Sequence, residues 1–253
     1  MPVEELHVLS KSFQALFNDA DYFLSEAKRL KRKLDNDSEY FDQNILSRVR
    51  ACSRACIIAS VAGLESFANS VLEAFKKHDI SVLDPEWMNK KHRSRDLEYW
   101  PVCEKIRFIP VLCNVEKNPP QDYFAEDNKD LEQLSEYAKI RNSIVHGRVT
   151  KIKFNIEIGK DGNHLVDDNL DENKWPITGI HKEVYRLEFG DASSVYTCVI
   201  SVVKDILIYM NSQVSKRFLL YQEFYPKSQE NLAIVRENAE KEPNWYLNIK
   251  EKS

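Results

Sequence analysis

The stretch Tyr137-Ala-Lys-Ile-Arg-Asn-Ser-Ile-Val-His-Gly147 lies near the middle of the 253-residue chain and gathers the side chains best suited to chemistry. Arg141 has a permanent positive charge and a planar fork of donors that suits phosphate. His146 is the residue type that takes or gives a proton near neutral pH. In a helix, Asn142 and His146 share a face, and Arg141 lies roughly 140° around the axis, a gap that its long side chain spans. We therefore expect the three side chains to line one cleft, with Gly147 ending the helix.

A structural explanation of the same stretch stays open. Arg141 would pair with an acidic side chain on a solvated helix face, and His146 would interact with the C-terminal end of the helix dipole. The chemical interpretation needs the context of the whole chain.

The composition favours a helical globular protein. The chain is 43% hydrophobic and 30% charged, which is ordinary for such proteins, and its 6 glycines are few for a Gly-rich nucleotide-binding architecture. The formal net charge of −4 gives no global attraction to nucleic acid, so any RNA contact has to rest on local basic patches.

The sequence also predicts a cytoplasmic protein without a membrane anchor. No segment was expected to have the apolar length of a membrane span, and the N-terminus lacks the basic and apolar regions of a secretory signal. The 5 cysteines form no disulfide framework and are expected to be reduced. Cys52 and Cys56 are four residues apart but have no second pair with metal-site spacing, so we expect core thiols, no metal and no cofactor.

Apolar residues at helical spacing predict a mainly α fold. The motif helix is expected to start near Asn128 or Asp130. Its buried side is predicted as Leu131, Leu134, Ala138 and Ile144/Val145, and its exposed side as Glu132, Glu136 and Lys139. The other long helices are predicted over 4–34, 39–77 and 192–222, with caps at 35–38 for the second and at Asp191 or Ser193 for the last.

Several basic residues are candidates for RNA binding. The basic end of the first helix is explained by the helix dipole alone. A second cluster combines Lys90, Lys91, Arg93 and Arg95 with nearby Trp87, Tyr99 and Trp100. This mixture suits single-stranded RNA, although a solvated loop whose aromatics anchor it to the bundle is the slightly favoured explanation. Arg148 follows the motif directly. Glu65, after the most apolar part of the second helix, either faces solvent or partners the Arg or His of the motif.

The remaining segments divide the predicted domain. Residues 80–128 contain five prolines and are predicted to be an irregular insertion with short helical pieces at 84–91 and 101–115. Strict alternation from Ile152 to Ile158 predicts a strand, followed by strands near 164–166 and 182–189, which form a small antiparallel β excursion over 150–190. We predict one helical domain over 1–225 and a charged C-terminal tail at 226–253.

The stretch Arg141-Asn142-Ser143-Ile144-Val145-His146, followed by Gly147, resembles the motif of the HEPN superfamily, in which Arg, a polar residue and then His occur in a late helix of a helical bundle. The resemblance implies a HEPN-like bundle and a metal-independent endoribonuclease of a toxin–antitoxin or antiviral defence system. Arg141, Asn142 and His146 would be its catalytic residues. It also implies a homodimer that supplies two Arg/His pairs, RNA as the substrate, and an antitoxin or defence-system protein as a partner.

The competing function is a non-catalytic helical dimerisation or interaction module, in which the same side chains hold an interface. Other hydrolase classes find less support. No His-Glu-x-x-His or comparable local metal motif is present, and neither is a Gly-x-Ser-x-Gly nucleophile elbow.

Overall fold

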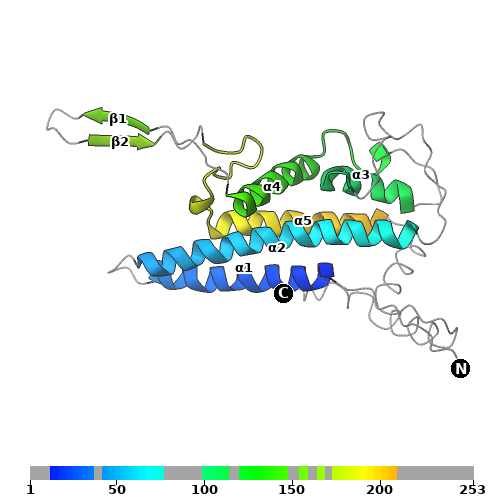
Figure 1. The fold of residues 1–253 in the computed structure, drawn as a ribbon, viewed down its shortest axis with the longest axis horizontal. Helices are drawn as coiled ribbons and strands as arrows, with labels where there is room; N and C mark the ends of the chain where they lie inside the picture. Colours follow the sequence, from blue (N-terminus) through cyan, green and yellow to red (C-terminus); the bar gives the residue numbers. More distant parts are fainter. Residues whose placement is uncertain are drawn as a thin grey trace, which may run out of the picture. The chain divides into compact units, whose positions relative to one another are not determined.

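The computed structural model describes residues 12–36, 42–76, 99–113, 120–147, 154–158, 164–168 and 173–209 (Figure 1). This part of the protein is mainly helical, which confirms the predicted class. It contains α1 (Ser12–Asn36), α2 (Gln43–Lys76), α3 (Val102–Cys113), α4 (Lys129–His146) and α5 (Phe189–Tyr209), and the short 3-10 helices η2 (Pro120–Asp122) and η3 (Val184–Arg186).

Two short strands follow α4 in the sequence. β1 (Phe154–Ile158) and β2 (His164–Asp168) pair antiparallel, with Phe154 opposite Asp168 and Ile158 opposite His164. The third strand, predicted over 182–189, is wrong, because this segment forms η3 and the start of α5. The predicted excursion over 150–190 is therefore wrong in its third strand, and the small β excursion itself stays a prediction.

The helix boundaries follow from local hydrogen bonds. α2 begins at Gln43 because Asp42 Oδ1 accepts hydrogen bonds from the backbone N–H groups of Asn44 (2.8 Å) and Ile45 (3.2 Å). The predicted capping of this helix by residues 35–38 is therefore wrong. The helical piece predicted over 101–115 is confirmed by α3.

The start of α5 differs slightly from the prediction. The helix begins at Phe189, and Asp191 acts from inside its first turn, where its Oδ2 accepts a 2.8 Å hydrogen bond from the Glu188 N–H. This is one half of a capping box, in which a side chain in the first turn satisfies the backbone of the residue before the helix.

The chain folds into two compact units, to which α1, α2 and α5 all contribute. Unit 1 comprises Met1–Asn18, Ala62–Asn128 and Ile200–Ser253, and unit 2 comprises Asp19–Val61 and Lys129–Val199. The single domain predicted over 1–225 and the tail at 226–253 are not decided by this division and stay predictions.

Aromatic rings fill the core of unit 1. Phe13 lies edge-on to Phe67, with ring centroids 5.6 Å apart, and Phe17 packs directly over Gly63. A Cβ at position 63 would lie 2.6 Å from the Phe17 ring, so the small residue predicted on α2 permits this close approach. Elsewhere in unit 1, the Trp100 and Phe108 rings are 5.5 Å apart.

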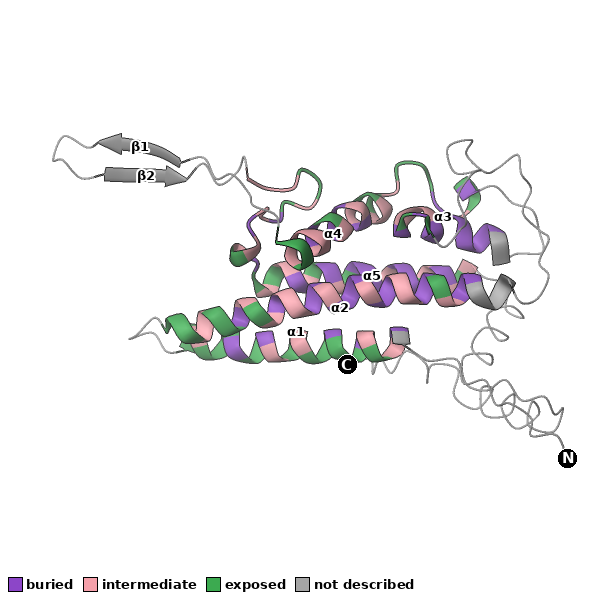
Figure 2. Ribbon diagram, in the orientation of Figure 1, coloured by how far each residue is buried: buried purple, intermediate pink, exposed green. Residues whose placement is uncertain are grey.

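In unit 2, α2 is the central buried helix, as the sequence predicted. Its middle turns within this unit are largely buried, including Cys56, Ile57 and Ser60 (Figure 2). The Cys56 thiol lies 3.9 Å from the carbonyl oxygen of Ala192 on α5, which confirms it as a core thiol. Burial raises its pKa to about 12, despite an opposing interaction with the Ser60 hydroxyl, so the thiol stays protonated near neutral pH.

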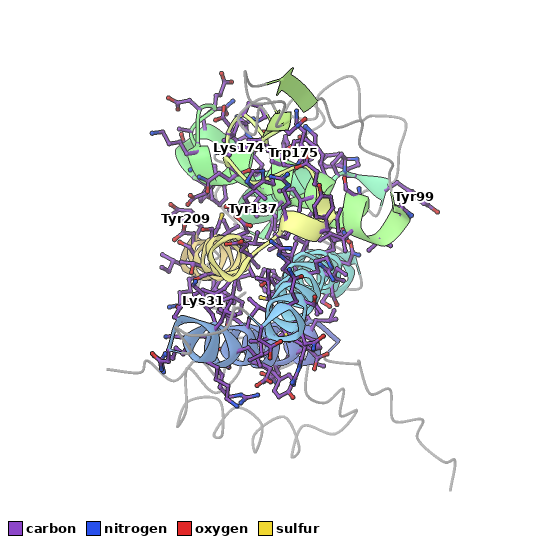
Figure 3. All side chains as sticks on the ribbon, turned by 90° about the vertical axis from the view of Figure 1, so that its left-hand side faces the viewer. Lys31, Tyr99, Tyr137, Lys174, Trp175 and Tyr209 are labelled. Carbon is purple, nitrogen blue, oxygen red and sulfur yellow. The ribbon has the colours of Figure 1, made fainter. Side chains whose placement is uncertain are left out.

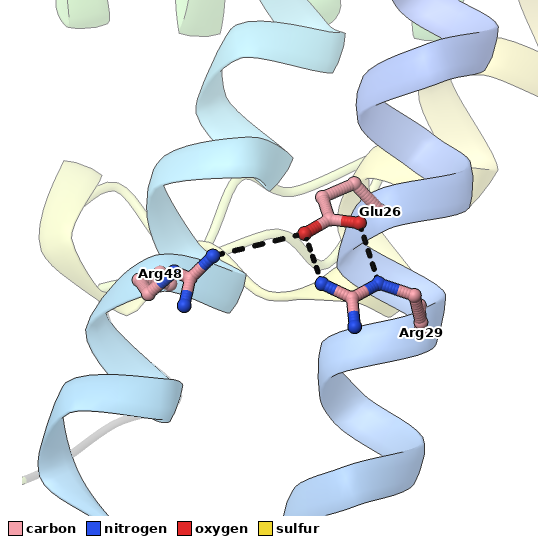
Figure 4. A network of polar contacts seen from close by, with 3 residues as sticks. All are labelled: Glu26, Arg29 and Arg48. Carbon is pink, nitrogen blue, oxygen red and sulfur yellow. Dashed lines mark hydrogen bonds and ion pairs between the residues drawn. The ribbon is translucent and has the colours of Figure 1, made fainter.

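An exposed ion-pair network connects α1 with α2 in unit 2 (Figure 4). The Arg29 guanidinium donates two hydrogen bonds to the Glu26 carboxylate, at 2.7 and 2.6 Å, and Arg48 Nη2 approaches the same carboxylate at 3.8 Å. Hydrogen bonding by Arg29 lowers the pKa of Glu26. Exposed pairs of this kind contribute little to stability.

Two helices have the length and apolar composition of a membrane span, so the prediction that no segment does is wrong. They are Gln43–Leu72 within α2 and the whole of α5, and 61% and 44% of their most apolar windows are buried within the fold. The core helices of soluble proteins meet the same criteria, so the predicted cytoplasmic location stays a prediction.

Candidate functional site

The motif lies in the last turns of α4, as the sequence predicted. The helix begins at Lys129, directly after Asn128, and has Asp130 and Glu132 in its first turn, where their charges favour the positive end of the helix dipole. It ends at His146, because Gly147 adopts a left-handed backbone with φ +55°.

The buried face of α4 is defined by Leu134, Tyr137 and Ile140, each less than 4% exposed. Two of the predicted orientations are wrong. Glu136, predicted on the exposed side, is buried, and Val145, predicted on the buried side, is 52% exposed. Burial raises the pKa of Tyr137 to about 12, and neighbouring negative groups add to this effect, so the phenol is not an acid near neutral pH.

Glu136 is buried because it binds a loop of the same unit. Its carboxylate accepts hydrogen bonds from the backbone N–H of Ile177, at 3.2 and 3.3 Å, and from that of Thr178, at 2.8 Å. Neighbouring backbone N–H groups form a concave anion site, and here an internal carboxylate occupies it. Glu136 therefore anchors residues 173–181 to α4.

The three motif side chains differ in burial. Arg141 follows Tyr137 by one helical turn, lies beside the buried face and is half-buried, as is Asn142. His146 is exposed in the last turn, at the green end of α4 in Figure 2. Since α4 is continuous through this region, Asn142 and His146 are an i,i+4 pair on one face, as predicted. The shared cleft stays a prediction.

Between the motif residues, the backbone is regular. The Ser143 hydroxyl donates a 2.9 Å hydrogen bond to the carbonyl oxygen of Lys139, one turn earlier on α4. The Ser143 hydroxyl is therefore used in a hydrogen bond within its own helix. The chemistry proposed for the site rests on Arg141, Asn142 and His146.

Most of the other predicted site residues are not tested by the structure. Lys90, Lys91, Arg93, Arg95 and Arg148 lie outside the described residues. Tyr99 and Trp100, next to the predicted basic cluster, are 69% and 4% exposed.

Glu65 is half-buried on α2 and belongs to unit 1, whereas the motif belongs to unit 2. The pairing of Glu65 with the Arg or His of the motif therefore stays a prediction. The basic end of α1 is partly neutralised within its own helix, because Arg29 pairs with Glu26 and Lys31 Nζ lies 3.3 Å from Asp35.

The sequence analysis missed two features in residues 173–186. One is a set of aromatic and basic side chains, in which Lys182 Nζ lies 6.0 Å from the Trp175 ring centroid and Arg186 Cζ lies 5.8 Å from that of Tyr185. The set was not predicted, because residues 182–189 were expected to form a strand.

The second missed feature is the pair of His181 and Glu183. His181 Nδ1 lies 3.8 Å from Glu183 Oε2, and the Glu183 side chain is only 2% exposed. Its proximity to a histidine had no local sequence signal beyond the His-Lys-Glu spacing. Within the described ranges, no three His, Cys, Asp or Glu side chains group closely enough to hold a metal ion.

Comparisons with protein-family models, with curated proteins and with solved structures find no match to this chain.

Proposed function

We propose that the protein is a metal-independent endoribonuclease of HEPN type, acting in the cytoplasm in a toxin or antiviral-defence context. The single observation that carries the proposal is the stretch Arg141-Asn142-x-x-Val145-His146-Gly147 at the C-terminal end of α4, with its histidine exposed. The mainly helical fold supports it.

The protein needs to supply only proton transfer and charge stabilisation, because RNA contains its own nucleophile. The 2′-hydroxyl attacks the adjacent phosphorus and loses its proton, the bond to the 5′-oxygen breaks, and that oxygen gains a proton, which leaves a 2′,3′-cyclic phosphate. His146 performs one of the two proton transfers. Arg141 binds the non-bridging oxygens and stabilises their developing charge, and Asn142 orients the imidazole or contacts the phosphate.

One chain supplies one motif histidine, so the opposite proton transfer needs a second group. In the proposed homodimer, residues 137–147 of both copies face one cleft across a two-fold axis, and each copy provides one histidine. Size-exclusion chromatography with light scattering should therefore return a dimer. A clean monomer at assay concentration would contradict the two-histidine mechanism.

The decisive experiment is RNA cleavage in EDTA by the wild type, His146→Ala and Arg141→Ala. We expect cleavage that survives chelation, yields 2′,3′-cyclic phosphate ends and disappears in both variants. Lys139→Ala is the matched control, because it removes a positive charge from the exposed face of the same helix and leaves the motif intact. Cleavage that persists in the motif variants would reject this site.

A helical interaction module is the second candidate, and the position of Arg141 favours it. Arg141 is half-buried beside the packed face of α4 and has interactions within the protein, as a structural arginine would. In that case, the folded dimer cleaves none of several RNAs, and Arg141→Ala lowers the melting temperature or the dimer affinity instead of an activity.

A further inference from the structure

Five aromatic and basic side chains between Asn173 and α5 have no part in the proposed catalytic roles. They are Lys174, Trp175, Lys182, Tyr185 and Arg186, and we call them the aromatic–basic loop. Two cation–π pairs connect its members, Lys182 with Trp175 and Arg186 with Tyr185. Figure 3 labels two of these side chains, Lys174 and Trp175.

The aromatic–basic loop is accessible from solvent. Tyr185 is 50% exposed, and the other four side chains are half-buried. Trp100 and Phe124 of unit 1 contrast with this, since both are buried in a core. The rings of the loop are therefore available to an external partner.

The local charge of this segment is positive, although the chain as a whole is negative. Residues 173–186 contain three basic side chains and one carboxylate, that of Glu183. Glu183 is 2% exposed and faces His181, so it contributes little negative charge to the surface. An anionic partner therefore meets a segment whose net charge is positive.

The segment is fixed in shape before any partner binds. The Trp175 N–H donates to the Ile180 carbonyl (2.8 Å), the Lys182 N–H donates to the Asn173 carbonyl (2.7 Å), and Lys174 pairs with His181 as a β-bridge. Glu136 of α4 binds the tip of this turn. A preorganised surface loses little conformational entropy on binding.

The loop runs beside the half of α4 that carries the motif. α4 and α5 are antiparallel, because the Cys198 thiol lies 3.9 Å from the Asp130 carbonyl oxygen, while Asp191 acts electrostatically on Tyr137. The residues before α5 therefore continue past the turns of α4 that follow Tyr137, and η3 indeed contacts α4. Tyr185 and Arg186, in η3, therefore lie toward the end of α4 that carries the motif.

We propose that the aromatic–basic loop binds single-stranded RNA, with unpaired bases stacking on Tyr185 and Trp175 and phosphates paired with the three cations. The identity of the ligand rests on the proposed function. Aromatic faces separated by basic side chains suit single strands, because every unpaired base offers a π-face and every nucleotide a phosphate. Bases in a duplex are already stacked on each other, so the loop discriminates against double-stranded RNA.

The test is fluorescence anisotropy with a labelled single-stranded 2′-O-methyl RNA of mixed sequence, which lacks the nucleophile and cannot be cleaved. The variants are Tyr185→Ala, Tyr185→Phe and Lys182→Ala in the full-length protein. Tyr22→Ala is the matched control, because Tyr22 is also a largely exposed tyrosine (65%) of unit 2, on α1.

We expect Tyr185→Ala to weaken binding about five- to a hundredfold, and Tyr185→Phe and Tyr22→Ala to bind as the wild type does. Lys182→Ala should reduce the slope of log K against log salt concentration by about 0.7, as the loss of one phosphate contact from a single strand predicts. A duplex of the same sequence should bind more weakly and be insensitive to Tyr185→Ala.

Several results would overturn this inference. They are no binding by the wild type, equal binding by wild type and Tyr185→Ala, equal losses in Tyr185→Ala and Tyr22→Ala, or equal affinity for the duplex. Retained melting temperatures in Tyr185→Ala and Lys182→Ala establish that their losses are not due to unfolding.

Cleavage, measured separately on unmodified RNA, distinguishes failure of this surface from failure of the nuclease. His146-dependent cleavage that ignores Tyr185→Ala, together with unchanged binding, rejects the surface and leaves the nuclease. Tyr185-dependent binding without cleavage rejects the nuclease and leaves the surface.

Discussion

The two halves of α4 use polar residues in opposite ways. In the first half, the carboxylate of Glu136 is buried and accepts hydrogen bonds from two backbone N–H groups of a distant loop, next to the buried Leu134 and Tyr137. In the second half, Val145 and His146 are exposed and the helix stops at Gly147. The first half holds the fold together, and the second half presents side chains to solvent.

This difference predicts that stability and function separate along a single helix. A buried polar group that loses its partners costs stability, because the partners stay buried and unsatisfied. An exposed group at a helix end costs little when it is removed. Substitutions in the two halves should therefore move different measurements.

The largest expected effect is on activity, in the exposed half. His146→Ala should reduce RNA cleavage by about 10²- to 10⁴-fold, because it removes a positioned proton-transfer group. Its melting temperature should stay within a degree or two of the wild type, since the side chain is exposed. Initial rates in EDTA and a thermal melt of the same samples measure both. A large decrease in melting temperature would show that His146 stabilises the fold. It would contradict the assignment of a functional, non-structural role to the second half of α4.

In the first half of α4, Glu136→Ala should destabilise the protein by about 1–3 kcal/mol, because the N–H groups of Ile177 and Thr178 lose their acceptor. Urea denaturation followed by circular dichroism measures the free energy of unfolding. Glu132→Ala is the control, since it removes a carboxylate from the exposed side of the same helix and should change stability by less than about 0.5 kcal/mol. Equal effects of the two substitutions would mean that the anchor contributes nothing.

The boundary of the exposed half is tested at Gly147. Gly147→Ala should cost about 1 kcal/mol, because a side chain at φ +55° is strained even though no atom lies within 4 Å of the new Cβ. Gly190→Ala in the first turn of α5 is the matched control, because it has equal space and no left-handed φ, and it should leave stability unchanged or raise it by up to about 1 kcal/mol. The difference between their urea midpoints isolates the backbone strain. A neutral Gly147→Ala would show that this helix end is frayed.

The helices were predictable because their signals are local. Apolar spacing gave α2 its buried middle, and the sequence around Gly147 gave α4 its end. The position of the motif within its helix followed in the same way. The buried carboxylate of Glu136 was not predictable, because its acceptor role depends on N–H groups about forty residues away in the sequence.

The strand assigned to 182–189 failed for a related reason. Its alternation of large side chains is a weak signal over so few residues, and the hydrogen bonds around η3 and the capping of α5 by Asp191 overrode it. Once that segment is a surface turn, Tyr185 becomes an exposed ring beside Arg186. The aromatic–basic loop could be recognised only from the structure.

The smallest expected effect concerns Asp191, which shares the packed region of Tyr137. Burial raises the pKa of Asp191, and the charge of Glu188 adds to this, although the Glu188 N–H and His181 act in the opposite direction. The folded protein therefore holds a proton on Asp191 at pH values at which the unfolded chain has lost it. Stability from this group is present below the unfolded pKa and is lost as the pH rises through the folded pKa.

Asp191→Asn removes this dependence, because the amide oxygen can still accept the hydrogen bond from Glu188 without a charge. Urea midpoints should therefore coincide at about pH 3, where the carboxyl group is protonated, and the variant should be slightly more stable at about pH 7. A variant that is less stable than the wild type only at neutral pH would mean that the carboxylate is favoured by the N-terminal end of α5. In that case, the stabilisation of the Asp191 carboxylate by the helix N-terminus would exceed the free-energy cost of burying its charge near Tyr137. The packed face of α4 around Tyr137 would then accommodate a neighbouring charge at little cost in stability.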